Sequence, residues 1–191
     1  TGADATEYPR HPVVVTPFEI LSREVTLEQF MRNKPQSKLQ GFGCDPMCPS
    51  SLLDNVTCPV TCVSWEEAME FCESPAVAGR LCTESEWEYA ARAGTDYSYY
   101  CGDDPTCLSQ QTSVVWHPVG SLSPNWWGVF DMADNAQEWT ADCWSSSHVG
   151  APFAAWQRRS GCVNGPFVTR GGGMRVTTRQ TGSSYNPKSV G

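Results

Sequence analysis

The chain has 191 residues and a formal net charge of −8 at pH 7, which excludes the basic face that nucleic-acid binding requires. Hydrophobic residues make up 40% of the chain and charged residues 18%, so the composition is not that of a disordered protein. No apolar run approaches the roughly 18 residues of a membrane span, so we expect no transmembrane segment.

The predicted elements follow in chain order. Residues 11–21, HPVVVTPFEIL, are rich in β-branched and aromatic residues and predict a strand. Capping boxes, in which Ser or Thr is followed three positions later by Glu or Gln, then predict short helices starting at Thr26, Ser64 and Thr83. After residue 95 no helical pattern returns, and we expect short strands joined by long loops.

Domain organisation follows from the same pattern. The chain contains 16 Gly and 14 Pro, which predicts a loop-rich structure, but it shows no internal repeat and no linker. We therefore expect one α+β domain over residues 1–191, with short helices packed on a small antiparallel sheet.

Cysteine is abundant, and its even number favours disulfides formed in an oxidising compartment. The ten residues are Cys44, Cys48, Cys58, Cys62, Cys72, Cys82, Cys101, Cys107, Cys143 and Cys162. The first four form two CxxxC pairs, so a zinc site of four thiolates remains an alternative for them.

Three stretches together resemble the formylglycine-generating enzyme family, also called the sulfatase-modifying-factor domain. They are CPVTCVSWEEAMEFC at 58–72, GRLCTESEWEYAARAG at 79–94 and HPVGSLSPNWWGVFDMADNAQEWTADCW at 117–144. The resemblance runs in order along nearly the whole chain. It implies that family's variant of the C-type lectin fold, with a closing strand expected beyond residue 191.

The resemblance breaks down where catalysis is expected. Members of the family carry two cysteines shortly after an Arg-Gly-Gly segment, and these bind copper(I) and oxidise a substrate cysteine to formylglycine with oxygen. The corresponding stretch here, TRGGGMRVTTRQ at 169–180, has no cysteine. Because copper(I) requires soft thiolate ligands, we expect neither copper binding nor formylglycine generation at this place.

Other features of this stretch are expected to be structural. Gly171, Gly172 and Gly173 should let the backbone pack tightly, and no phosphate loop is indicated because neither Lys nor a capped helix follows. Arg175 and Arg179 should brace neighbouring carboxylates or carbonyls through their guanidinium groups.

Disulfide pairing is suggested by comparison with the family motifs. Cys101–Cys107 and Cys143–Cys162 each close a loop inserted between those motifs, and we expect these two pairs first and Cys72–Cys82 next. Cys162 lies eight residues before Arg170 and could approach the site, but pairing with Cys143 is favoured.

The resemblance also implies a calcium site in the turn DMADNAQEW, residues 131–139. Its ligands would be the carbonyls of Ala133, Asp134 and Ala136 and the carboxylate of Glu138. Calcium is a hard cation that prefers such oxygen ligands. An Asx-rich turn without an ion is the alternative interpretation.

These observations favour a non-catalytic, disulfide-stabilised binding or assembly module that is secreted, periplasmic or at the cell surface, with a protein or a glycan as its partner. One alternative is an oxidoreductase, either a copper- and oxygen-dependent cysteine oxidase of the formylglycine-generating type or a related oxidative maturation enzyme. Another is a structural subunit of a larger assembly.

Overall fold

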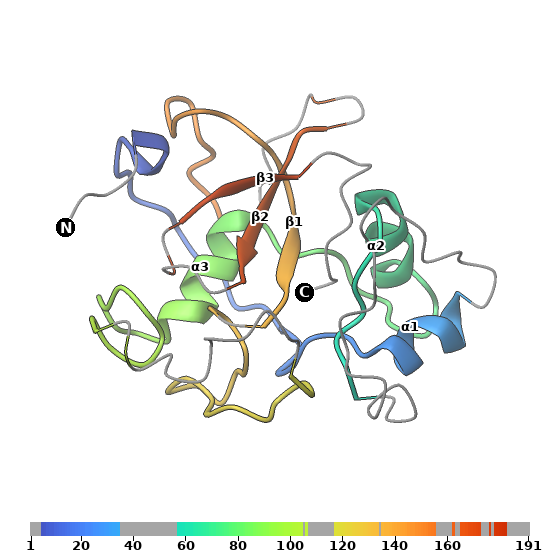
Figure 1. Ribbon diagram of the computed structural model, residues 1–191. Helices are drawn as coiled ribbons and strands as arrows, with labels where there is room; N and C mark the ends of the chain where they lie inside the picture. Colours follow the sequence, from blue (N-terminus) through green and yellow to red (C-terminus); the bar gives the residue numbers. More distant parts are fainter. Residues whose placement is uncertain are drawn as a thin grey trace.

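A computed structural model describes residues 5–34, 57–104, 106, 117–133, 135–155, 162, 165–172, 176 and 178–182. Their elements are, in order, η1 (Ala5–Glu7), α1 (Leu27–Asn33), α2 (Trp65–Cys72), α3 (Glu84–Arg92), β1 (Gln137–Cys143), β2 (Phe167–Gly171) and β3 (Gln180–Gly182). Figure 1 shows the three α-helices around a small sheet, with long loops between the elements. The expected loop-rich α+β architecture is confirmed. None of the helices in these ranges has the length and apolar character needed to cross a bilayer.

All three predicted capping boxes are present. At the start of α3, the Thr83 hydroxyl accepts a hydrogen bond from the Glu86 backbone N–H at 3.2 Å, and the Glu86 carboxylate accepts one from the Thr83 N–H at 2.9 Å. Thr26 and Ser64 cap α1 and α2 in the same way. Each box satisfies backbone donors that the first helical turn leaves without a partner.

The predicted strand at residues 11–21 is wrong. This segment forms only one isolated bridge, between Val14 and Ala154. Pro12 and Pro17 lack the backbone N–H that a continuous ladder of hydrogen bonds needs, so the β-branched run cannot extend into a strand. Two backbone hydrogen bonds, from Val14 N–H to the Phe153 carbonyl and from Ala155 N–H to the Val14 carbonyl, hold it to the distant segment at 153–155.

The sheet is antiparallel, with the strand order β1-β2-β3. Its register places Glu138 opposite Arg170 and Trp139 opposite Thr169, with an irregularity between Trp139 and Cys143. The sheet therefore brings Arg170 and Gly171, the start of the Arg-Gly segment at 170–173, directly beside the turn that precedes β1.

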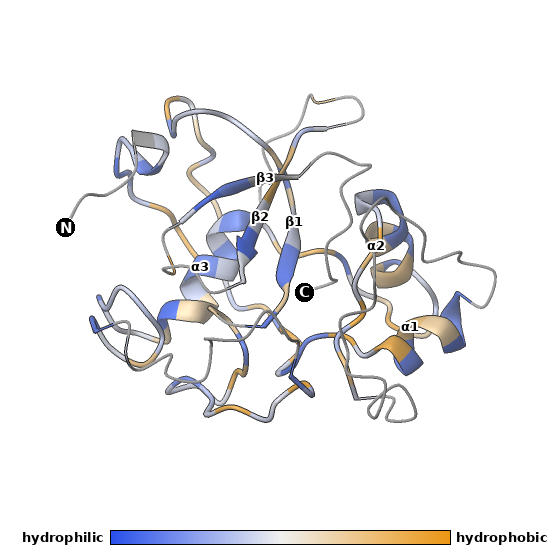
Figure 2. Ribbon diagram, viewed as in Figure 1, coloured by the Kyte–Doolittle hydropathy of each residue, from blue (hydrophilic) through white to orange (hydrophobic). Residues whose placement is uncertain are grey.

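Two apolar clusters form the core. The first lies between α1, α2 and the sheet, where Phe30 stacks on Phe71 at 5.3 Å between ring centroids and Trp65 stacks on Phe167 at 4.0 Å. Figure 2 shows that α1 and α2 carry both hydrophobic and hydrophilic residues, as expected of helices with one face on a core. The second cluster surrounds Trp87 of α3.

Candidate functional site

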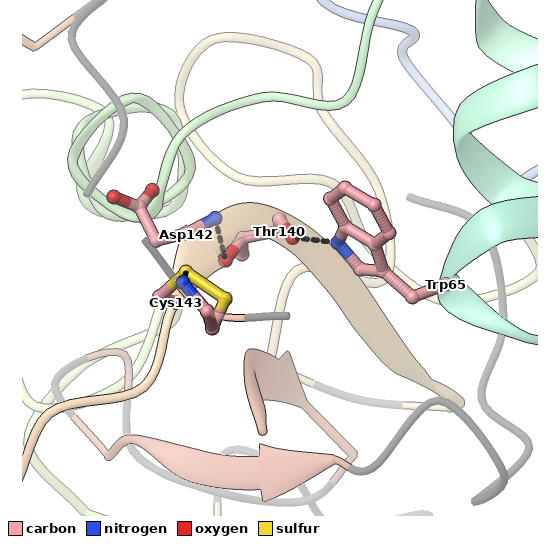
Figure 3. The surroundings of a disulfide bond; sticks show 5 residues. Trp65, Thr140, Asp142 and Cys143 are labelled. Carbon is pink, nitrogen blue, oxygen red and sulfur yellow. Dashed lines mark hydrogen bonds between the residues drawn. A yellow bond between two sulfur atoms is a disulfide. The ribbon is translucent and has the colours of Figure 1, made fainter. Parts of the chain in front are cut away.

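One expected disulfide is confirmed. Cys143, at the end of β1, is bonded to Cys162, with 5.7 Å between their Cα atoms. Figure 3 shows this bond beside Thr140, whose carbonyl accepts a hydrogen bond from the indole of Trp65 at 2.8 Å. The bond uses the thiol that lies nearest in sequence to the Arg-Gly segment.

Other cysteines are only partly described. Cys58 and Cys101 are also disulfide-bonded. The disulfide at Cys58 removes one of the four thiolates that the zinc alternative requires. Cys44, Cys48 and Cys107 lie outside the described residues, so the Cys101–Cys107 pairing stays a prediction.

The expected Cys72–Cys82 disulfide is not formed, and both residues carry thiols. Cys72 ends α2 inside the first core cluster. Cys82 belongs to the segment before α3, where its carbonyl accepts a hydrogen bond from the Ala141 N–H of β1 at 2.8 Å. Burial raises the pKa of Cys72 to about 11, and burial together with nearby carboxylates raises the pKa of Cys82. Both thiols therefore stay protonated at neutral pH.

We predict that these two thiols react with a thiol reagent only when the protein unfolds. The native protein should react slowly at both, because the thiolate is the reactive form, Cys72 is buried and Cys82 is partly buried. Denaturant without reductant should expose them, and the variant Cys72→Ser/Cys82→Ser should then lose both equivalents. Rapid labelling of either residue in the native protein would contradict this.

Arg170 lies in the middle of a buried ion-pair network. Its side chain in β2 is fully buried, and its guanidinium contacts Glu84 at 3.2 Å and Glu88 at 2.6 Å, both from α3. It also donates to the Val176 carbonyl at 2.7 Å and lies over the Trp87 ring. Two carboxylates thus compensate this buried cation.

Arg179 completes the network from the other side. It forms an ion pair with Glu84 through two nitrogens, with 2.9 Å between Nη2 and Oε2. Its Nη1 also donates to the carbonyls of Thr6 and Ser145, each at 2.9 Å. The expectation that Arg179 braces carboxylates and carbonyls is confirmed, whereas Arg175 lies outside the described residues.

Two of the three glycines are described, and both have positive φ, 77° at Gly171 and 69° at Gly172. A Cβ on Gly171 would lie 3.3 Å from the Ala136 carbonyl oxygen, and one on Gly172 would lie 2.5 Å from the Gln137 side chain. Close backbone packing is therefore confirmed here. Gly173 lies outside the described residues.

A second group of charges surrounds the turn before β1. Glu138 is buried and accepts a hydrogen bond from the Trp87 indole. Glu24, from the segment before α1, is also buried and accepts hydrogen bonds from the Ala136 N–H at 2.9 Å and from Asn135 at 2.5 Å. Asp131 is buried too, and one of its carboxylate oxygens has no hydrogen-bond partner within the described residues.

Burial raises the pKa values of all three carboxylates, and neighbouring acids add to the rise at Glu24 and Glu138. Burial and the neighbouring acids raise the pKa of Glu24 well above its ordinary value, and the pKa of Glu138 is raised to about 7. Burial also raises the pKa of Asp131, while Arg23 and His117 oppose that shift. Such an excess of buried negative charge would be relieved by a cation.

The residues of the expected calcium site fit a hard ion in their chemistry. Ala133, Ala136 and Glu138 lie in this turn or at the start of β1 and are buried, and Asp134 lies outside the described residues. Among the described residues, no three Asp, Glu, His or Cys side chains are grouped as a metal site. The expected site needs only one carboxylate, because its other ligands are backbone carbonyls. Glu24 was not anticipated, since it lies 112 residues from Ala136 in sequence.

The sequence model of the sulfatase-modifying factor enzyme 1-like domain matches residues 1–189. The chain is 33% identical over 115 residues to the formylglycine-generating enzyme of Thermomonospora curvata, covering 51% of this chain and 37% of that enzyme. It is 27% identical over 175 residues to the inactive C-alpha-formylglycine-generating enzyme 2 of Bos taurus, covering 74% and 56%. The matched part of this chain thus spans 37% of the length of the first relative and 56% of the length of the second.

Two solved structures share the fold. Treponema denticola variable protein 1 superimposes with a TM-score of 0.68 at 22% identity, covering 84% of this chain and 77% of that one. PvdO from Pseudomonas aeruginosa superimposes with a TM-score of 0.58 at 24% identity, covering 70% and 59%. At these identities the likeness concerns the fold alone.

Proposed function

Because the chain belongs to the sulfatase-modifying factor enzyme 1-like domain family, we propose that it uses this scaffold as a non-catalytic binding or assembly module. We assign the scaffold to the C-type-lectin-like variant that the family resemblance implied. The family model covers nearly the whole chain, and the relatives include both formylglycine-generating enzymes and an inactive homologue. Membership therefore does not by itself assign a reaction.

One observation carries the proposal. The stretch 169–180 corresponds to the segment that carries the catalytic cysteines in members of the family, but it has no cysteine. It instead supplies Arg170 and Arg179 to a buried ion-pair network with Glu84. Cys162, the thiol nearest in sequence, is held in a disulfide. This stretch therefore supplies none of the soft thiolate ligands that a copper(I) centre requires.

The enzyme alternative has one observation in its favour, the thiols of Cys72 and Cys82. Metal binding and nucleophilic chemistry require thiolates, and the raised pKa values of both groups disfavour that form. We therefore keep the oxidase as the second candidate. The disulfides support a location outside the cytoplasm, either secreted, periplasmic or at the cell surface.

The test is formylglycine formation. We expect no conversion of a cysteine-containing sulfatase peptide by mass spectrometry when copper and oxygen are supplied, with the Thermomonospora curvata enzyme as the positive control. Turnover that is lost in Cys72→Ser, Cys82→Ser or Cys162→Ser would refute the non-catalytic proposal and place the oxidase first.

We also propose calcium as the resident ion of the turn at 131–139. Ala133, Asp134 and Ala136 would bind it through their carbonyls and Glu138 through its carboxylate, because calcium prefers hard oxygen ligands. The ion would offset the repulsion among Glu24, Asp131 and Glu138. Its role would be to hold the turn against the sheet.

A further inference from the structure

A cavity of about 720 Å³ lies beside the ion-pair network, because its lining includes Glu84 and Glu88, which pair with Arg170 and Arg179. Its walls come from the N-terminal segment, from α3, from the loop that follows α3 and from His148. Figure 1 shows the N-terminal segment passing on the same side of the molecule as α3. The cavity is thus built by segments that are far apart in sequence and held by the core, as ligand sites often are.

Aromatic rings mark the cavity and its rim. Tyr8, Tyr89 and Tyr97 line it, and each is about half exposed. Within the described part of the chain, none of their hydroxyl groups has a hydrogen-bond partner. The ring of Tyr89 also contacts that of Trp127, with 5.0 Å between centroids, so the aromatic surface continues outward from the cavity.

The turn that carries Trp127 is held together by the side chain of Asn125. Asn125 is buried, and its side-chain oxygen accepts hydrogen bonds from the backbone N–H groups of Trp127 and Val129 at 3.0 and 3.1 Å. Its amide donates to the Ala90 carbonyl in α3 at 2.8 Å, which ties the turn to the helix beside the cavity. The neighbouring Trp126 is 78% exposed, so a second large apolar ring lies in solvent on this turn.

Polar groups in the cavity are already held in place and largely neutralised. Glu88 is paired with Arg170 at 2.6 Å and with Arg92 at 2.9 Å. The rings of His11 and His148 lie 4.9 Å apart, and burial together with Arg179 lowers the pKa of His148 to about 4, so its ring is neutral at physiological pH. The buried Nε2 of His11 has no hydrogen-bond partner among the described residues.

This combination discriminates between ligand classes. The acidic residues Glu7, Glu84, Glu88 and Asp96 in the lining disfavour an anion such as a phosphate. A strongly cationic ligand gains little, because Arg170 and Arg179 already neutralise Glu84 and Glu88, and Arg10 and Arg92 also line the cavity. Fixed donors and acceptors beside exposed ring faces suit a neutral molecule that presents many hydroxyl groups and flat C–H faces. A pyranose ring has both properties.

We propose that this cavity and the adjoining Trp126–Trp127 turn form a binding site for a neutral oligosaccharide. One sugar would occupy the cavity between the tyrosines and the paired polar groups, and the next would stack on the tryptophans at the rim. The proposal rests on the non-catalytic binding function and specifies its ligand. The two proposals can fail independently, because the formylglycine assay tests the non-catalytic function and sugar binding tests this site.

The test is calorimetric titration with maltohexaose, cellohexaose, xylohexaose and the hexamer of N-acetylglucosamine. We expect at least one to bind with a Kd of roughly 10 μM to 1 mM. Tyr89→Ala and Trp126→Ala should each weaken that binding about tenfold or more, while Tyr89→Phe, which keeps the ring, should weaken it less. Phe153→Ala, which removes an exposed aromatic ring that does not line the cavity, should leave it unchanged.

Three results would overturn the proposal. The first is no heat of binding for any of the four probes when each is titrated to about 5 mM, a concentration that would still reveal a Kd in the millimolar range. The second is binding that survives both Tyr89→Ala and Trp126→Ala. The third is tighter binding of an aromatic peptide at the same residues, which would assign the surface to a protein partner. Trp126 is exposed, so its variant should fold even if Tyr89→Ala does not.

Discussion

Replacing Arg179 with alanine is expected to lower the free energy of unfolding by about 3–5 kcal/mol, the range for breaking a buried ion pair from one side. Arg179 is buried and supplies two nitrogens to Glu84 and a third donor to the carbonyls of Thr6 and Ser145. Its removal leaves two carbonyls without this donor and weakens the compensation of a buried carboxylate. Urea denaturation measures the change.

The matched control is Arg32→Ala. Arg32 pairs with Glu28 at 2.6 Å on α1, but its side chain is 72% exposed, so the loss should be below about 1 kcal/mol. Arg179→Lys should fall between the two, because lysine keeps the charge but cannot present a fixed fork of donors. Equal losses for Arg179→Ala and Arg32→Ala would contradict the assignment of the network as buried and structural.

Local signals in the sequence were sufficient to predict the helices. Each capping box depends on residues three positions apart, so Thr83 and Glu86 identify the start of α3 without knowledge of the rest of the fold. Local signals were not sufficient for residues 11–21, where the predicted strand is absent. The β-branched residues of this segment favour a strand, but a strand also needs a partner along its length, and no local pattern contains that information.

The charged sites depend on long-range pairing and were predicted only in part. Arg179 was expected to brace carboxylates, but its partner Glu84 lies 95 residues away. Likewise, Glu24 reaches the turn before β1 across 112 residues. Cys72 and Cys82 are close in sequence, but α2 and the segment before α3 do not bring the two thiols together, so the predicted pairing was wrong.

Calcium removal is expected to lower the melting temperature by about 5–11 °C. An ion present at about 100 times its Kd stabilises a folded protein by about 2.7 kcal/mol, and a chain of this size loses about 2–4 °C per kcal/mol. The proposed ligands lie beside Glu24 and Asp131, so chelation would leave several buried acids without a compensating cation. Thermal melts in calcium and in chelator measure the effect.

Two variants separate an ion ligand from a purely structural residue. Glu138→Gln should abolish the response to calcium, but in chelator it should melt no lower than the parent protein. The amide oxygen can still accept a hydrogen bond from Trp87, and the substitution removes a charge that burial and the nearby Asp131 disfavour. Glu70→Gln, which alters an exposed carboxylate on α2, should keep the full calcium response. If chelator leaves the parent melting curve unchanged, the turn holds no ion, and the raised pKa values of Glu24 and Glu138 then describe acids that the fold keeps protonated.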